Sequence, residues 1–127
     1  MRDQHSLTFA ARLKSVKCAL RGIWLLVKSE HNAWLHAAAT LLVTTAGLLL
    51  GLSVGEWCWI VLAITSVWTA EALNTALETL TDLASPTIHP IARNAKDIAA
   101  GAVLLAALGA GIIGVLVFGP HLMRALD

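Results

Sequence analysis

Acidic and amide side chains recur at a regular spacing near the middle of this 127-residue sequence. Steps of three, four and four residues separate Glu71, Asn74, Glu78 and Asp82, and at about 100° per residue all four lie within roughly 80° on one side of an α-helix. An ionised carboxylate at bilayer depth costs at least ~2.5–3.5 kcal/mol. We therefore expect this acidic stripe to face protein, water or a bound cation, and to carry chemistry or transport at a membrane surface.

Further polar residues are predicted in the same layer, namely Glu30, Lys96 and Asp97. Carboxylates together with substrate phosphates are typical ligands of Mg²⁺, Glu71 could act as a general base, and a helix N-terminus near Lys96 would attract an anion. The sequence contains no phosphate-binding glycine loop, HExxH motif or Cys/His cluster. These residues predict Mg²⁺-assisted phosphoryl transfer, and cation- or proton-coupled transport fits them almost as well.

The composition limits the fold class. With 57% hydrophobic residues and a mean hydropathy of +0.74, the chain is too apolar for a soluble domain. Membrane helices are predicted at 33–52, 57–84 and 95–118, since each can cross a hydrocarbon core ~30 Å thick. Apolar residues every three or four positions, with basic residues between them, predict an amphipathic surface helix at 8–28. We expect an all-α integral membrane protein in which 1–127 form a single domain.

Local signals predict where the helices end. The pair Ser85-Pro86 should end the second membrane helix, because the residue before a proline is disfavoured in the α region. Asn94 is expected to cap the third membrane helix, with Asp97 reaching back to it, and Gly119-Pro120 to end it. Small residues along this third helix favour a homo-oligomer: Gly101, Ala106, Ala107, Gly109, Ala110, Gly111 and Gly114.

The distribution of basic residues predicts the topology. Six of the nine Lys and Arg residues precede the first membrane helix, and the connector between the second and third helices carries Arg93 and Lys96. The positive-inside rule then places the N-terminus and this connector in the cytoplasm. Cys18 and Cys58 would lie near opposite membrane faces, so both are expected to be free thiols.

A run of motifs in the second half of the chain resembles the prokaryotic diacylglycerol kinase family. The motifs are Glu71-Ala-Leu-Asn74-Thr-Ala-Leu-Glu78, Asp82, His89-Pro90 and Ala95-Lys96-Asp97. The similarity covers roughly residues 10–120. It is greatest to the undecaprenol kinase branch, which the segments beginning at Glu30, His36 and Glu56 also match.

This resemblance implies a homotrimeric, multi-pass kinase of the bacterial inner membrane with its active site in the cytoplasm. Such an enzyme transfers the γ-phosphate of ATP, bound with Mg²⁺, to the hydroxyl of a membrane lipid. The resemblance assigns the general base to Glu71 and the Mg²⁺ ligands to Glu30 and Glu78. The expected partners are the lipid alcohol, ATP and further copies of the chain, and no nucleic acid is expected.

The same resemblance gives roles to the remaining motif residues. Asn74, Lys96 and Asp97 are expected to position the phosphates and the lipid headgroup. His89 is expected in a loop over the nucleotide. It leaves the roles of Cys18 and His36 open.

Three departures from the family pattern concern the acceptor. Ala19 and Ala100 stand where the best-known diacylglycerol kinases carry serines, and Asn94 replaces an arginine. The catalytic carboxylates are retained. We therefore expect undecaprenol as the acceptor and diacylglycerol as the alternative within the family. A cation- or proton-coupled transporter and a non-catalytic scaffold are the rivals from other classes.

Overall fold

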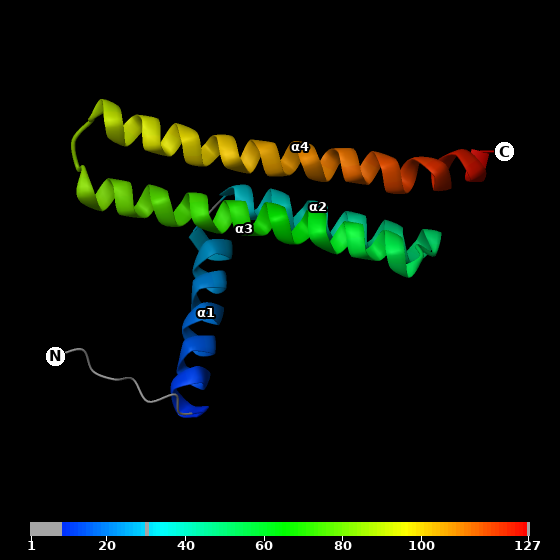
Figure 1. The fold of residues 1–127 in the computed structure, drawn as a ribbon, viewed down its shortest axis with the longest axis horizontal. Helices are drawn as coiled ribbons and strands as arrows, with labels where there is room; N and C mark the ends of the chain where they lie inside the picture. Colours follow the sequence, from blue (N-terminus) through cyan, green and yellow to red (C-terminus); the bar gives the residue numbers. More distant parts are fainter. Residues whose placement is uncertain (1–8, 30, 127) are drawn as a thin grey trace. The chain divides into compact units, whose positions relative to one another are not determined.

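The computed structural model describes residues 9–29 and 31–126. These residues form four helices and no strand (Figure 1): α1 (Phe9–Ser29), α2 (His31–Leu50), α3 (Val54–Ala84) and α4 (Pro90–Leu126). The expected all-α class is confirmed. The chain divides into two units, 1–30 with α1 and 31–127 with α2, α3 and α4.

In the unit that contains α1, most of the large apolar side chains of the helix are exposed, whereas Leu26 is buried. Phe9, Leu20 and Trp24 are among the exposed ones, and the Lys28 ammonium lies 4.8 Å from the centre of the Trp24 ring, a cation–π contact. The helix predicted at 8–28 is therefore present at Phe9–Ser29. Its position on a membrane surface stays a prediction.

The other three helices are each long and apolar enough to cross a membrane. The most apolar 18-residue windows within Asn32–Leu50, Val54–Ala84 and Pro90–Leu126 have mean hydropathies of 1.6, 1.4 and 2.5, and about 20 apolar residues suffice for a span. Most of each window is not buried within the chain itself, since the buried shares are 11%, 28% and 6%. The chain is therefore a multi-pass membrane protein.

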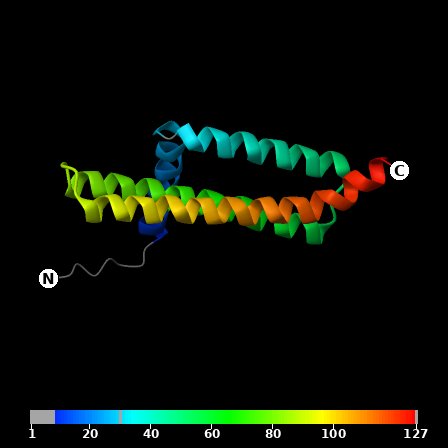
Figure 2. The same cartoon turned by 90° about the horizontal axis from the view of Figure 1, so that it is seen from above.

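The three membrane helices lie side by side, with α3 packed along α4 and in contact with α2 (Figure 2). Successive helices run in opposite directions. A small core of Leu52, Ile60 and Val117 joins them near the turn between α2 and α3. The link between α3 and α4 lies at the other end of this unit, and the acidic stripe runs toward that end.

The turn between α2 and α3 combines two capping motifs. Gly51 adopts a φ of 67°, and the amide of Leu52 donates to the carbonyl of Gly47 at 3.1 Å, which is a Schellman C-cap. Ser53 then caps α3 in a capping box with Glu56. The predicted helix start at residue 57 is wrong, because this capping box begins the helix at Val54.

The start of α4 also differs from the prediction. His89 caps this helix: its carbonyl accepts from the amide of Arg93 at 3.0 Å, and its Nδ1 accepts from the amide of Ile91 at 3.2 Å. Pro90 follows at the first helical position, where its missing N–H has no cost. The capping role predicted for Asn94 with Asp97 is therefore wrong, because the helix begins one turn earlier.

The other two predicted helix ends have opposite outcomes. Ser85 is the C-cap of α3, and its amide donates to the carbonyl of Thr81 at 2.8 Å, which confirms the end predicted at Ser85-Pro86. The end predicted at Gly119-Pro120 is wrong, because α4 continues through Pro120 to Leu126. A proline inside a helix removes one backbone bond and bends the axis, and the last turns of α4 change direction in Figure 2.

Candidate active site

The acidic stripe continues the buried face of α3. The buried residues of this helix follow a single three- and four-residue spacing: Ile60, Ala63, Val67, Glu71 and Asn74. Glu78 and Asp82 extend the same spacing toward the end of the helix, where Glu78 is half-buried and the Asp82 side chain is 66% exposed. The stripe therefore leads from a dry interior to an accessible helix end.

Glu71 is the deepest carboxylate of the stripe. It is only 1% exposed, and among the described residues neither of its side-chain oxygens has a hydrogen-bond partner. Its Oε2 lies 3.4 Å from His36 Nε2 on α2, which is longer than an ordinary hydrogen bond. A buried carboxylate without donors is costly, so these oxygens are suited to a proton, a cation or a substrate hydroxyl.

Asn74 lies one turn further along α3. Its Nδ2 donates to Glu78 Oε1 at 3.1 Å, which orients the Glu78 carboxylate. Asn74 Oδ1 and Thr75 Oγ1 are buried without a hydrogen-bond partner among the described residues. The structure thus places unsatisfied oxygens of Glu71, Asn74 and Thr75 on neighbouring turns of one helix. Thr75 was not predicted from the sequence.

Lys96 on α4 reaches across to α3. Its ammonium forms an ion pair with Asp82, which brings a cation to the accessible end of the acidic stripe. Asp97 points elsewhere: its side chain is 72% exposed and lies 3.9 Å from Arg93 Nε. The structure therefore joins Lys96 to the stripe, whereas the Asp97 carboxylate pairs with Arg93 on its own helix.

His89 and Glu30 complete the predicted site residues. His89 is exposed in the link between α3 and α4, and since its Nδ1 accepts the amide of Ile91, its Nε2 is the nitrogen left for another partner. Glu30 lies outside the described residues. Within residues 9–29 and 31–126, no group of three His, Cys, Asp or Glu side chains converges as a metal site.

Two cavities flank the middle of α3. One of about 290 Å³ is apolar along most of its length, has His36, Thr40 and Trp68 in its wall, and is otherwise bounded by small and aliphatic side chains of α2, α3 and α4. The other, of about 520 Å³, lies between α3 and α4, with Asn74 and Ala95 in its wall. Polar site residues therefore border apolar space beside α3.

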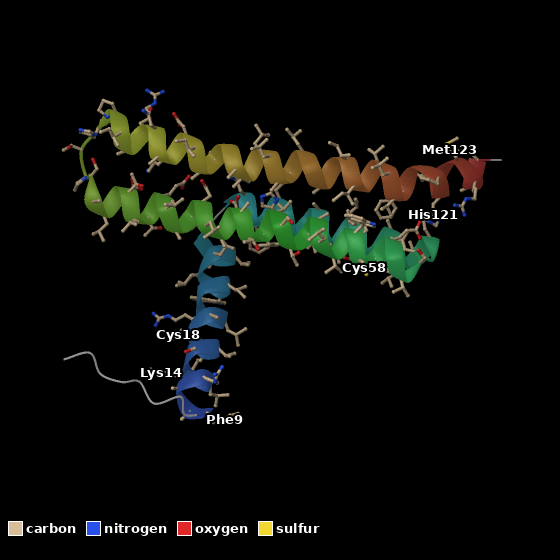
Figure 3. The ribbon with its side chains drawn as sticks, in the orientation of Figure 1. Phe9, Lys14, Cys18, Cys58, His121 and Met123 are labelled. Carbon is tan, nitrogen blue, oxygen red and sulfur yellow. The ribbon has the colours of Figure 1, made fainter. Side chains whose placement is uncertain are left out.

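Polar contacts at the opposite end of the bundle were not predicted. Ser53 N and Oγ donate to Glu56 Oε2 at 2.8 and 2.7 Å, and Glu56 Oε1 lies 2.8 Å from His121 Nε2. Figure 3 labels His121 on the last turns of α4, at the same end as Cys58. This contact ties the end of α4 to the start of α3. The Ser-x-x-Glu spacing signals the capping box in the sequence, whereas no local signal predicts its contact with His121.

Both cysteines are free and exposed, as expected. Cys18 and Cys58 therefore play no part in holding the fold by a disulfide.

The fold and site together define a small multi-pass membrane protein with a carboxylate-rich site on its central helix. Residues 17–118 match the family model described as prokaryotic diacylglycerol kinase, and the chain belongs to this family. The chain is therefore a lipid kinase. The assignment excludes the transporter and scaffold interpretations.

Two curated relatives are similar over most of the chain. An undecaprenol kinase of Bacillus subtilis is 46% identical over 109 residues, which cover 86% of this chain and 89% of the relative. A diacylglycerol kinase of Synechocystis is 40% identical over 117 residues, which cover 90% of this chain and 66% of the relative. The membership of the family implies a nucleotide phosphate donor and a lipid alcohol acceptor.

Proposed function

We propose that this lipid kinase transfers the γ-phosphate of ATP, bound with Mg²⁺, to undecaprenol, giving undecaprenyl phosphate and ADP. The observation that carries the proposal is Glu71, a buried carboxylate whose two oxygens have no hydrogen-bond partner among the described residues. In the reaction, the lipid O–H bond breaks, the lipid oxygen bonds to the γ-phosphorus, and the bond from this phosphorus to the ADP oxygen breaks. The proton passes to the Glu71 carboxylate.

The remaining site residues support binding and orientation. The Asn74 amide holds one oxygen of Glu78, which leaves the other Glu78 oxygen available to a ligand. The Lys96 ammonium, on the accessible side of the stripe, is suited to a phosphate because charge-assisted hydrogen bonds to phosphate oxygens are strong. We assign Asp97 and the Nε2 of His89 to the same nucleotide-binding surface at the start of α4.

The side chains present fit a bound Mg²⁺. The available ligand atoms are hard oxygens: those of Glu71 and Asn74 Oδ1 have no hydrogen-bond partner among the described residues, and Glu78 has one oxygen bonded to Asn74 and one free for a ligand. Mg²⁺ is usually held by one or two carboxylates plus substrate phosphates and water. We assign Glu78, with Glu30, to hold the ion, which would neutralise phosphate charge during transfer.

Undecaprenol is favoured over diacylglycerol by similarity. The Bacillus protein named undecaprenol kinase is 46% identical to this chain, and the match covers 89% of that protein. The Synechocystis protein named diacylglycerol kinase is 40% identical, and the match covers 66% of it. The apolar cavities beside α3 suit the hydrocarbon portion of either lipid. Diacylglycerol therefore remains the second candidate acceptor.

We further propose that the protein is a homotrimer in the bacterial inner membrane, with the link between α3 and α4 in the cytoplasm. The small residues of α4 and the low burial of this helix within one chain support association with other copies. The basic residues before α2, together with Arg93 and Lys96 in the first turns of α4, support this orientation.

The proposal is tested by incubating the purified protein with Mg²⁺, ATP labelled in its γ-phosphate and either C55-polyprenol or diacylglycerol. We expect transfer to both to depend on Mg²⁺, with the higher kcat/KM for the polyprenol. Glu71→Gln keeps the size of the side chain but removes the base, so transfer should fall by about 10²–10⁴-fold. Undiminished transfer by Glu71→Gln would remove the base assignment, and faster transfer to diacylglycerol would reverse the acceptor assignment.

A further inference from the structure

His36 is the basic side chain that the fold brings to Glu71. It lies on α2, 35 positions earlier in the chain, with its Nε2 3.4 Å from Glu71 Oε2. The His36 side chain is 15% exposed, so water competes little for this nitrogen. Because neither Glu71 oxygen has a hydrogen-bond partner among the described residues, a small closing movement of the imidazole would supply one.

The position of the imidazole is itself constrained by two other side chains. Its ring packs edge-on against the Trp68 ring, with 6.2 Å between centroids. Trp68 Nε1 donates to Thr40 Oγ1 at 3.0 Å, and Thr40 Oγ1 donates to the carbonyl of His36 at 2.7 Å. Thr40 follows His36 by one turn of α2, and Trp68 precedes Glu71 by one turn of α3, so two facing turns form a closed chain of contacts.

The local sequence explains why these four side chains meet. Residues four apart on α2 and three apart on α3 share a helix face, so His36 with Thr40 and Trp68 with Glu71 form two pairs that face each other where α2 contacts α3. An indole N–H buried in this region needs an acceptor, and the Thr40 hydroxyl supplies it. The Trp68 ring is thereby fixed in the orientation that supports His36.

We propose that His36 is a positioning residue for the kinase reaction: through Nε2 it holds Glu71 Oε2, so that Glu71 Oε1 alone faces the lipid hydroxyl. The inference rests on the proposed role of Glu71 as the base. The 3.4 Å separation agrees with this role, because hydrogen bonds of catalytic groups are often long without substrate and shorten in the complex. Thr40 and Trp68 set the angle of the imidazole.

The test compares three substitutions at His36 in the full-length protein. Gln carries an amide N–H at a distance along the side chain similar to that of Nε2, Asn carries one only where Nδ1 lies, and Leu carries none. We expect kcat for lipid phosphorylation to fall about 10²-fold in His36→Leu, because misplacing a reacting group by about 1 Å has an effect of that size. His36→Gln should recover most of kcat, His36→Asn should not, and KM for ATP should stay within about threefold in all three.

A matched control substitutes the histidine at the opposite end of the bundle. His121→Gln and His121→Leu should both leave kcat unchanged, since His121 contacts Glu56 and not the acidic stripe. Equal kcat in His36→Gln and His36→Asn would overturn the inference, as would a loss of kcat that follows the denaturation temperature alone. If Glu71→Gln loses transfer while His36→Leu does not, the positioning role fails and the proposed function stands. If Glu71→Gln keeps transfer, Glu71 is not the base, and the positioning role of His36 fails with it.

Discussion

Single residues of the acidic stripe differ in their surroundings more than in their chemistry. Glu71 is buried without hydrogen-bond donors among the described residues, Glu78 is half-buried and held by Asn74, and Asp82 is exposed and paired with Lys96. The cost of removing a carboxylate from water falls along this series. The buried position is suited to exchanging a proton, and the accessible positions to charged ligands.

Lys96 offers a test at this scale. If its ammonium stabilises phosphate charge, Lys96→Met should lower kcat/KM for ATP by about 10²–10³-fold, the loss typical of removing one preorganised donor. Steady-state kinetics with varied ATP at saturating lipid measures the change. The pair with Asp82 is largely exposed, so it should contribute little to stability.

A charge exchange separates phosphate binding from simple pairing. The double variant Lys96→Asp with Asp82→Lys re-forms the ion pair in reverse, and it should denature at nearly the same temperature as the unsubstituted protein. Its activity should remain as low as that of Lys96→Met. Recovery of activity in the double variant would mean that Lys96 serves only to pair with Asp82.

At the scale of the helices, the turn between α2 and α3 depends on a close approach at Gly47. A Cβ on this residue would lie 2.9 Å from both Leu52 Cδ1 and Trp57 Cη2, so a side chain must move to make room. Overpacking of this kind costs about 1–3 kcal/mol, and the gain in helix propensity of about 1 kcal/mol offsets part of it. Gly47→Ala should therefore lower the thermal denaturation temperature in detergent.

Gly55 provides the matched control for this prediction. It lies in the first turn of α3, and a Cβ added there meets no atom within 4 Å. Gly55→Ala should leave the denaturation temperature unchanged or raise it slightly. A Gly47→Ala protein as stable as Gly55→Ala would show that the packing of Leu52 and Trp57 does not constrain the turn.

Helix ends were predicted well only where one local signal dominates. Ser85-Pro86 ends α3 as expected, because the steric restriction before proline is strong. Asn94 was expected to cap α4, but His89 and Pro90 start this helix one turn earlier. Pro120 was expected to end α4, but the helix continues, and the contact of His121 with Glu56 holds its last turns against α3. Such a contact between distant residues has no local signal.

At the scale of the whole molecule, three successive membrane helices place the start of α2 and the end of α4 on opposite sides of the membrane. The basic residues predict that the link between α3 and α4 is cytoplasmic and that the C-terminal end of α4 is external. Thr87 is exposed in this link and Ala125 is exposed at the other end. In a Cys18→Ser, Cys58→Ser background, a membrane-impermeant maleimide added to right-side-out vesicles should label Ala125→Cys only.

The control for this topology experiment is permeabilisation of the same vesicles, after which Thr87→Cys should react as fast as Ala125→Cys. Labelling of Thr87→Cys in intact vesicles would contradict the proposed orientation. It would also place the accessible end of the acidic stripe on the wrong side for cytoplasmic ATP.

The amino-acid sequence by itself determined the all-α membrane class, the face shared by Glu71, Asn74, Glu78 and Asp82, and the family, because helical periodicity, hydropathy and motif spacing are properties of neighbouring residues. Only the tertiary structure decided which side chains from different helices meet. It brings His36 and Thr40 to Trp68 and Glu71, joins Lys96 to Asp82, and joins His121 to Glu56. These contacts depend on how the helices pack, and packing depends on side chains distant in the chain.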